Sequence, residues 1–203
     1  MRFVFVDLGN VLVDFNPETT VARLCRASGL DGARVQHVLY GESWVQLNMG
    51  TIEWSVFEET VKAELGGRVS PDEIRSAWCA ALTPNGETAS VLASLVGRHP
   101  IYLLSNTDPM HFACSRKLVP ILESFSGFVL SYAIHKMKPD PSFFRQALYM
   151  TGARASDCVF IDDSSENVES ATVLGFCSIR YESALLLRRA LSTLGLEVSP
   201  CSV

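Results

Sequence analysis

Several features that would assign a protein to a specialised class are missing from this sequence of 203 residues. No apolar run approaches the roughly 20 residues that a membrane-spanning helix needs, so the sequence predicts no membrane partner. The net charge of −5 and the scattered basic residues argue against a nucleic-acid partner. Repeats and low-complexity segments are also lacking. What is left is one well-buried globular domain with, at most, a small insert.

The six cysteines form no CxxC pair, and their spacing matches neither a zinc site nor a disulfide scaffold. We therefore expect reduced core residues at Cys25, Cys79, Cys114, Cys158, Cys177 and Cys201. The N-terminal segment RFVFVDLGNVLVDF has a charge within its apolar stretch and no small-residue cleavage site, so we interpret it as a strand and not a signal peptide. These observations together predict a cytoplasmic location.

Short apolar runs predict the strands of a parallel sheet that is buried on both faces. Four are clear and the last is weaker: Phe3–Val6, Ile101–Leu104, Phe128–Leu130, Val159–Ile161 and Cys177–Ile179. Helices separate them, for instance over Pro141–Thr151, which starts at Asp140, and over residues 165–174, which end at Gly175. Alternating strands and helices predict an α/β fold of three layers, with helices on both faces of the sheet.

The interval of residues 15–83 breaks this alternation, because it contains helix signals and no strand-like run. Four helices are predicted from start signals and apolar periodicity at Asn16-Pro17, Asp31, Trp54–Leu65 and Ser70-Pro71-Asp72-Glu73. We expect a small all-helical insert, closed by the turn at residues 83–86, within a core of residues 1–14 and 84–203. Residues 197–203 are predicted to be a loose tail.

Polar side chains follow four of the predicted strands at the carboxyl end, where open parallel sheets bind ligands. They are Asp7, then Ser105 and Asn106, then Lys138, and finally Asp162 and Asp163. Each has an ordinary alternative. Asp7 could form a turn, and Lys138 could be a solvated loop residue. Ser105 or Asn106 could cap one following helix, and Asp163 and Ser164 could cap the next. Chance would rarely place this mixture at consecutive strand ends, so the set indicates a catalytic site.

The chemistry of phosphoryl transfer accounts for the mixture. A carboxylate such as Asp7 can attack a phosphoryl group and form an aspartyl-phosphate, which divides one difficult displacement into two. The approach of two anions needs positive charge, which Mg²⁺ held by Asp7, Asp163 and a backbone carbonyl would supply. Lys138 would add charge and hold Asp7 ionised, while Ser105 and backbone N–H groups would bind phosphate oxygens.

The segments DLGNVLV, LLSNT, KPDPSFF and IDDSSENV resemble, in order and spacing, the four motifs of the haloacid dehalogenase superfamily. The resemblance covers about residues 3–180, and the helical insert resembles the C1 cap of that superfamily. It implies a Rossmann-like core and a Mg²⁺-dependent phosphatase acting on a small phosphorylated metabolite. The segment DLGNV is most similar to the corresponding motif in a branch of the superfamily that includes bacterial phosphatases of glucose 1-phosphate. A sugar phosphate is therefore one expected substrate.

The resemblance also implies the role of each site residue. Asp7 and Lys138 would be catalytic, and Ser105, Asn106 and Lys138 would bind phosphate. The metal ligands would be Asp7, the backbone carbonyl of Gly9, Asp162 and Asp163.

One departure lies at Gly9, where most phosphatases of the superfamily have a second aspartate that acts as general acid and base. Its loss favours substrates whose leaving group needs little protonation, such as sugar 1-phosphates or acyl phosphates. Alternatively, Asn10, Asp14, a cap residue or ordered water partly takes over the role, or the protein is a catalytically impaired binding protein. The sequence does not indicate an oligomeric state.

Two other kinds of enzyme in the superfamily also lack this second aspartate. A metal-independent 2-haloacid dehalogenase would lack the pair Asp162 and Asp163. A phosphonate hydrolase would need a lysine near Met49-Gly50, and Lys62 lies well past it. In the insert, Trp44 and Trp54 are expected in the core, although the segment Trp44–Thr51 also offers aromatic and amide groups to a ligand.

Overall fold

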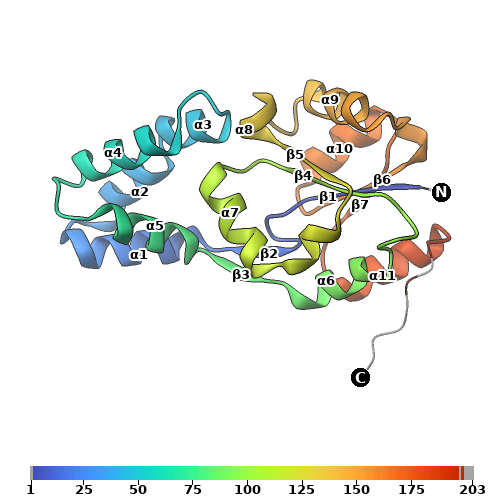
Figure 1. Ribbon diagram of the computed structural model, residues 1–203, viewed down its shortest axis with the longest axis horizontal. Coiled ribbons are helices and arrows are strands. Elements are labelled where there is room, and N and C mark those ends of the chain that lie inside the picture. The colour runs from blue at the N-terminus through green and yellow to red at the C-terminus, as the bar shows by residue number, and fades with distance from the viewer. Residues whose placement is uncertain (1, 197, 199–203) are drawn as a thin grey trace.

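A computed structural model describes residues 2–196 and residue 198, and a five-stranded parallel sheet lies at its centre (Figure 1). The strand order is β5-β4-β1-β6-β7, and all four neighbouring pairs are parallel. The strands are β1 (Phe3–Val6), β4 (Ile101–Ser105), β5 (Gly127–Leu130), β6 (Cys158–Asp162) and β7 (Cys177–Arg180). The predicted strands are confirmed to within one residue at each end.

Alternate side chains of the sheet point into two separate layers of helices, as the period of a strand requires. Val4 and Val6 of β1 pack in a cluster with residues of α6, α7 and α11, whereas Phe5 packs in a cluster with residues of α9 and α10. These helices are α6 (Gly86–Ala93), α7 (Pro109–Leu118), α9 (Pro141–Thr151), α10 (Ser165–Val173) and α11 (Ala184–Thr193). The predicted three-layer α/β core is therefore confirmed.

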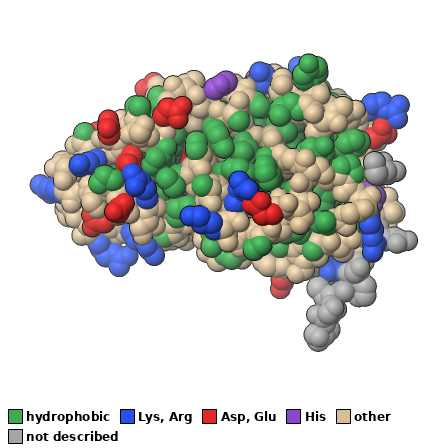
Figure 2. All heavy atoms as spheres, in the orientation of Figure 1, with side chains coloured by type: hydrophobic (Ala, Val, Ile, Leu, Met, Phe, Trp, Pro, Cys, Tyr) green, Lys and Arg blue, Asp and Glu red, His purple; other side chains and the backbone are tan. Residues whose placement is uncertain are grey.

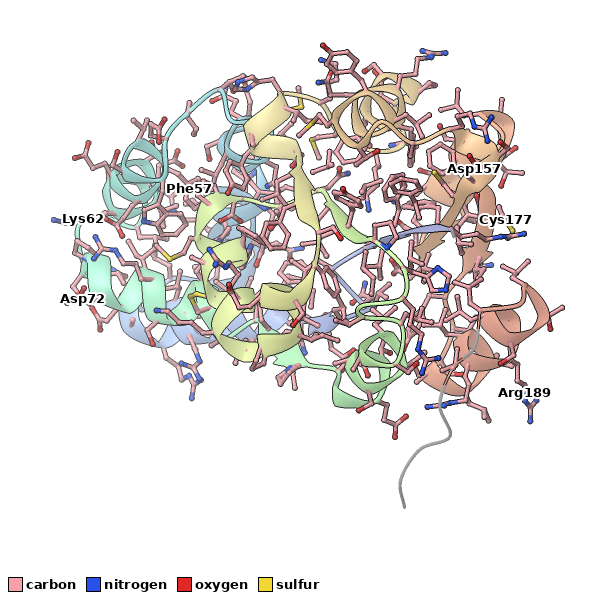
Figure 3. All side chains as sticks on the ribbon, turned by 45° about the vertical axis from the view of Figure 1, so that its right-hand side comes forward. Phe57, Lys62, Asp72, Asp157, Cys177 and Arg189 are labelled. Carbon is pink, nitrogen blue, oxygen red and sulfur yellow. A yellow bond between two sulfur atoms is a disulfide. The ribbon has the colours of Figure 1, made fainter. Side chains whose placement is uncertain are left out.

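Five helices form a second group beside this core (Figure 1). They are α1 (Pro17–Ser28), α2 (Gly32–Tyr40), α3 (Glu42–Asn48), α4 (Trp54–Glu64) and α5 (Pro71–Cys79). The group has its own apolar cluster, in which Phe57 and Trp78 are fully buried, while Lys62 and Asp72 lie at its outer end (Figure 3). Charged side chains gather over this end of the molecule (Figure 2).

The predicted helix starts are found in the structure, and one helix of the insert was not predicted. Asn16 caps α1, Asp31 caps α2, and Ser70 with Glu73 forms a capping box at α5. Helix α3 follows Gly41, which makes no side-chain capping bond, so the sequence carries no start signal for it. The division into residues 15–83 and the rest stays a prediction.

The turn predicted at residues 83–86 was wrong, and most of the predicted tail lies outside the described residues. β2 (Val13–Phe15) pairs antiparallel with β3 (Leu82–Pro84), so strands link the helical group to the core where a turn was predicted at residues 83–86. Asn85 instead caps α6. The remaining short elements are α8 (Ser131–Ile134), η1 (Pro120–Ser124) and η2 (Ala155–Asp157). The tail predicted at residues 197–203 lies outside the described residues, apart from residue 198.

The expectation that all six cysteines are reduced was wrong. Cys79 at the end of α5 forms a disulfide with Cys114 of α7, because the packing of these helices places their Cα atoms 5.9 Å apart. Cys25, Cys158 and Cys177 are free, and Cys201 lies outside the described residues. None of the helices in the described part of the chain is both long and apolar enough to cross a bilayer.

Candidate active site

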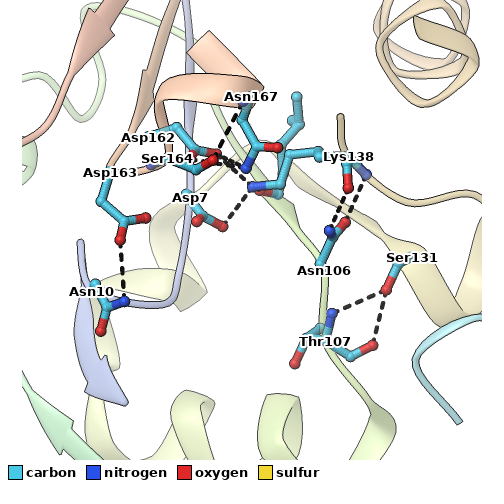
Figure 4. Close-up of polar contacts among 11 residues, drawn as sticks. Asp7, Asn10, Asn106, Thr107, Ser131, Lys138, Asp162, Asp163, Ser164 and Asn167 are labelled. Carbon is cyan, nitrogen blue, oxygen red and sulfur yellow. Dashed lines mark hydrogen bonds and ion pairs between the residues drawn. The ribbon is translucent and has the colours of Figure 1, made fainter. Parts of the chain in front are cut away.

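The carboxyl ends of β1, β4 and β6 meet at one edge of the sheet, and Lys138 lies among them (Figure 4). Its Nζ atom is 2.7 Å from Oδ1 of Asp7 and 2.7 Å from Oδ2 of Asp162. It also donates to the backbone carbonyl of Leu104 at 2.9 Å. Lys138 is only 4% exposed, so an ammonium group lies between two carboxylates with little solvent to screen it.

Burial sets the electrostatics of this triad. Burial chiefly raises the pKa of Asp7, Lys138 opposes this rise and the charge of Asp162 adds to it, so that the pKa of Asp7 is raised to about 7. Burial by itself would lower the pKa of Lys138, but the two carboxylates more than compensate and raise it. A divalent cation beside Asp7 would oppose the effect of burial and favour the ionised carboxylate that a nucleophile requires.

Asp162 and Asp163 are adjacent in sequence but differ in their contacts. Asp162 is fully buried and, besides Lys138, accepts from the backbone N–H of Ser164 at 2.9 Å and from Nδ2 of Asn167 at 3.0 and 3.1 Å. Asp163 is half-buried, and its Oδ2 accepts from Nδ2 of Asn10 at 3.1 Å. Asp162 thus orients Lys138 and the start of α10, and Asp163 has more free oxygen capacity toward a ligand.

The donor set at this edge fits a hard divalent cation. One carboxylate oxygen from each of Asp7, Asp162 and Asp163 lies within 4.8 Å of the other two. Gly9, the predicted carbonyl ligand, lines the same cavity as Asp7 and Asp163. Oxygen ligands of this kind suit Mg²⁺. The contacts of Asp162 make Asp7 and Asp163 the more available pair.

Ser105 and Asn106 do not cap α7, contrary to their ordinary alternative role. Asp108 caps α7 with its side chain, and Ser164 caps α10. Asn106 exchanges two hydrogen bonds of 2.8 Å with the backbone N–H and carbonyl of Lys138 (Figure 4). Ser105 is buried and lines the cavity beside Asp7. Ser105 is therefore placed to meet a phosphate, and Asn106 holds the loop that carries Lys138.

A cavity of about 160 Å³ opens from these strand ends toward the helical group. Its polar lining residues near the strand ends include Asp7, Gly9, Asn10, Ser105, Asn106, Thr107 and Asp163. The cavity is also lined by Leu8, Val13, Phe15, Trp44, Asn48, Leu82, His111 and Ser115. The structure thus brings all the predicted site residues to one edge; Lys138 and Asp162 are not among the lining residues and join the site through the contact of Lys138 with Asp7.

Sequence reasoning missed the residues that support the site, whereas the segment Trp44–Thr51, named as able to contact a ligand, supplies Trp44 and Asn48 to the cavity lining. Asn167 was not predicted, although its place five residues after Asp162 puts it in the first turn of the predicted helix that starts near residue 165. Trp44 and Asn48 lie on α3, the helix without a start signal. Asn10 was considered only as a replacement acid, and the structure shows it bonded to Asp163.

His111, which lines the cavity, is held in place by buried contacts with Asp108 and Trp78. Nδ1 of His111 lies 2.6 Å from Oδ2 of Asp108, and its Nε2 lies 3.2 Å from the backbone carbonyl of Trp78. Burial would raise the pKa of Asp108, but His111 and the indole N–H of Trp78 together keep it below its ordinary value. Both ring nitrogens of His111 are engaged, so the ring serves as a wall of the cavity and not as a free acid.

Comparison with known proteins agrees with this geometry. Residues 1–175 match the family of haloacid dehalogenase-like hydrolases. The chain is 24% identical over 203 residues to D-ribitol-5-phosphate phosphatase of Bacteroides thetaiotaomicron, which covers 96% of this chain and 98% of that protein. It is 24% identical over 183 residues to a sesquiterpene phosphatase of Aspergillus oryzae, covering 88% of this chain and 89% of that protein.

One solved structure extends the comparison to the fold. A haloacid dehalogenase family enzyme of Bacteroides thetaiotaomicron, in complex with magnesium and inorganic phosphate, has a TM-score of 0.80 at 25% identity. The match covers 90% of this chain and 94% of that chain.

Proposed function

The chain belongs to the haloacid dehalogenase-like hydrolases, and we propose that it is a Mg²⁺-dependent phosphatase of small phosphomonoesters that acts through an aspartyl-phosphate. The observation that carries this proposal is the position of Lys138, buried between Asp7 and Asp162 with Asp163 close by. The magnesium and phosphate bound to the similar enzyme of Bacteroides thetaiotaomicron support it.

The residues of the site divide the reaction between them. An oxygen of Asp7 attacks phosphorus, the bond from phosphorus to the ester oxygen breaks, and water then hydrolyses the aspartyl-phosphate. Lys138 and Ser105 contact the non-bridging oxygens as charge develops there, and Asn106 and Asp162 hold Lys138 in place. Asp7, Asp163, the carbonyl of Gly9 and Asp162 would hold Mg²⁺, which would supply positive charge to offset the negative charge of the phosphate.

Gly9 limits which esters react quickly. It offers no side chain to protonate the departing oxygen, a contribution typically worth about 10²–10⁴-fold in rate. The leaving group must therefore carry its own negative charge well, as a sugar 1-phosphate, an acyl phosphate or an aryl phosphate does. A binding protein without turnover is the alternative, and the intact contacts of Lys138 with Asp7 and Asp162 favour the enzyme.

A small phosphorylated metabolite as the substrate and a cytoplasmic location are both parts of this proposal. The names of the two relatives cover a polyol phosphate and a sesquiterpene phosphate, so they favour a small phosphorylated metabolite without choosing a sugar phosphate. The cytoplasmic location was predicted partly from reduced cysteines, and the disulfide between Cys79 and Cys114 removes that support.

Phosphate release from p-nitrophenyl phosphate tests the proposal. We expect turnover that requires Mg²⁺, that EDTA abolishes, and that Asp7→Asn lowers by roughly 10⁴-fold or more because the nucleophile is lost. Beryllium fluoride with Mg²⁺ should raise the melting temperature of the wild type and leave that of Asp7→Asn unchanged.

A matched control lies at the other end of β6. Asp157 precedes this strand, at the edge of the sheet opposite Asp162, so Asp157→Asn should keep full activity (Figure 3). Equal rates for the wild type and Asp7→Asn would refute the assignment of the nucleophile. Dehalogenation of a 2-haloacid in EDTA would identify a metal-independent dehalogenase instead.

A further inference from the structure

Asn10, in the loop after β1, has an unusual backbone conformation. Among the described residues it is one of two, apart from glycines, with a positive φ angle, and its φ is +53°. Asparagine tolerates this left-handed region better than most residues that have a side chain. The backbone N–H of Asn10 donates to the carbonyl of Val13 at 2.6 Å. Asn10 therefore closes the turn that follows the proposed nucleophile, Asp7.

This turn also sets the direction of the carbonyl of Gly9. The C=O of Gly9 and the N–H of Asn10 belong to one trans peptide, in which the two groups point in opposite directions. Because that N–H points at Val13, the carbonyl of Gly9 points away from Val13. Within the part of the chain that the structure describes, it accepts no hydrogen bond, whereas the carbonyl of Leu8 accepts two of 2.9 and 3.0 Å. The loop thus leaves the carbonyl of Gly9 available to a cation.

The side chain of Asn10 reaches a second candidate ligand, Asp163 (Figure 4). Its Oδ1 accepts from the backbone N–H of Phe15 at 3.2 Å, and its Nδ2 donates to Oδ2 of Asp163 at 3.1 Å. Because a backbone N–H can only donate, the bond from Phe15 fixes which end of the amide is the oxygen and turns the NH₂ group toward Asp163. Oδ1 of Asp163 has no hydrogen-bond partner among the described residues, so it is the oxygen left for a cation.

Few residue types could make all of these contacts at this position. Glycine accepts a positive φ angle but has no side chain to hold Asp163. Aspartate would keep the shape but would place a second carboxylate beside Asp163. Alanine lacks the amide and disfavours the left-handed region. Of these four types, only asparagine combines the backbone conformation with a donor for Asp163 and an acceptor for Phe15.

We propose that Asn10 is the positioning residue of the metal site, directing the carbonyl of Gly9 through its backbone and the carboxylate of Asp163 through its amide toward one cation. The choice of Mg²⁺ as that cation rests on the proposed function. A partner that holds a metal ligand by a hydrogen bond typically contributes about 10–100-fold in metal affinity. Asn10 is exposed, so solvent competes for its bonds and an effect of about tenfold is expected.

Titration calorimetry with Mg²⁺ alone, on the wild type and on Asn10→Gly, tests this proposal. Asn10→Gly keeps the backbone conformation and removes only the amide, so it should fold and should raise the Kd for Mg²⁺ about tenfold. The Mg²⁺ concentration that gives half-maximal phosphate release from p-nitrophenyl phosphate should rise by about the same factor. Saturating Mg²⁺ should restore most of the rate, whereas a purely structural loss would lower the rate at every Mg²⁺ concentration.

Asn10→Ala separates the contribution of the backbone from that of the amide. Both variants lack the amide, but only alanine disfavours the left-handed conformation that directs the carbonyl of Gly9. Asn10→Ala should therefore raise the Kd for Mg²⁺ further than Asn10→Gly does, by about another threefold. Equal Kd values for the two variants would overturn the role assigned to the backbone.

Asn85 provides a matched control away from the site. Its Nδ2 donates to the hydroxyl of Tyr181 at 3.0 Å and its Oδ1 accepts from the backbone N–H of Thr88 at 3.1 Å, and Asn85 does not line the cavity. Asn85→Gly thus removes the same two kinds of hydrogen bond as Asn10→Gly. It should lower the melting temperature and leave the Kd for Mg²⁺ within about twofold of the wild-type value.

The results separate this proposal from the proposed function. A wild-type Kd for Mg²⁺ in Asn10→Gly, or an equal rise in Asn85→Gly, would overturn the role of Asn10 while the phosphatase stands. Mg²⁺ binding that Asn10→Gly weakens, without phosphate release from any phosphomonoester or a response to beryllium fluoride, would overturn the phosphatase and support the role of Asn10. Absence of Mg²⁺ binding to the wild type would overturn both.

Discussion

Gly9 is the residue at which this site departs from the pattern that it resembles, and the structure leaves room to reverse the departure. A Cβ atom built on Gly9 meets no heavy atom within 4 Å, and Gly9 is not among the glycines with positive φ. We therefore expect Gly9→Asp to fold and to raise kcat on an alkyl phosphate, whose leaving group needs a proton, by tenfold or more. On p-nitrophenyl phosphate the gain should be small.

Gly9→Asn is the control, since it adds the same volume without an ionisable group. It should leave the alkyl and aryl phosphates in their wild-type ratio. If Gly9→Asp and Gly9→Asn behave alike in a phosphate-release assay on both substrates, proton transfer is not what Gly9 limits.

The principal residues of the site were predictable, and the residues that support them were not. Asp7 follows β1, and Ser105 and Asp162 are the last residues of β4 and β6. A parallel sheet brings the carboxyl ends of its strands to one edge whatever the loops do. The bond from Asn10 to Asp163 joins residues 153 positions apart. It depends on the path of two loops, which no local pattern encodes.

At the scale of helices and strands, signals with a local cause were reliable. α9 runs over Pro141–Thr151 as predicted, because Asp140 caps it and Gly152 ends it in the left-handed conformation. α3 was missed because Gly41 gives no capping bond and only seven residues follow. β2 and β3 were missed because each has three residues and is stabilised by its partner strand.

The cap of α7 joins this helix to α5, and removing its charge should destabilise the protein. Asp108 accepts from the backbone N–H groups of Met110 and His111 and also contacts the rings of His111 and Trp78. In Asp108→Asn the amide oxygen can still cap α7, but the NH₂ group faces Nδ1 of His111 and the indole N–H of Trp78 in place of a carboxylate oxygen. We expect the free energy of unfolding at pH 7, measured in urea, to fall by about 3 kcal/mol.

This stabilisation should depend on pH with a defined sign. Because the pKa of Asp108 is lower in the folded state than its ordinary value of 3.8, its contribution is complete above about pH 4 and is lost as the pH falls through the folded value. The difference in the free energy of unfolding between the wild type and Asp108→Asn should therefore become smaller at acidic pH. Asp140→Asn, at the exposed cap of α9, should change stability little at any pH. A difference that stays constant down to pH 3 would contradict the role of the charge.

At the scale of the whole molecule, the helical group and the core are held together near the cavity by contacts of several kinds. β2 pairs with β3, and Nδ1 of His135 lies 2.9 Å from the carbonyl of Met49. At Gly50, where φ is +66°, a Cβ atom would overlap the backbone of Tyr132 in α8. The cavity wall is thus formed by both parts of the chain, and its shape depends on their docking.

The disulfide between Cys79 and Cys114 is the covalent link across this junction, and its loss should be measurable. It closes a loop with a sequence separation of 35, for which the entropy lost by the unfolded chain corresponds to about 4 kcal/mol. Replacing both cysteines by serine should lower the free energy of unfolding by up to this amount. Wild type unfolded in urea with a dithiol reductant should then match the double variant.

Cys25 on α1 provides the control, since it is free and half-buried within the same helical group. The free energy of unfolding of Cys25→Ser should fall on addition of reductant by as much as that of the wild type, because the disulfide is intact in that variant. In a thiol titration under denaturing conditions, the wild type should also show two fewer free thiols before reduction than after it. Wild-type unfolding curves that coincide with and without reductant would show that this link contributes nothing to the docking of the two parts.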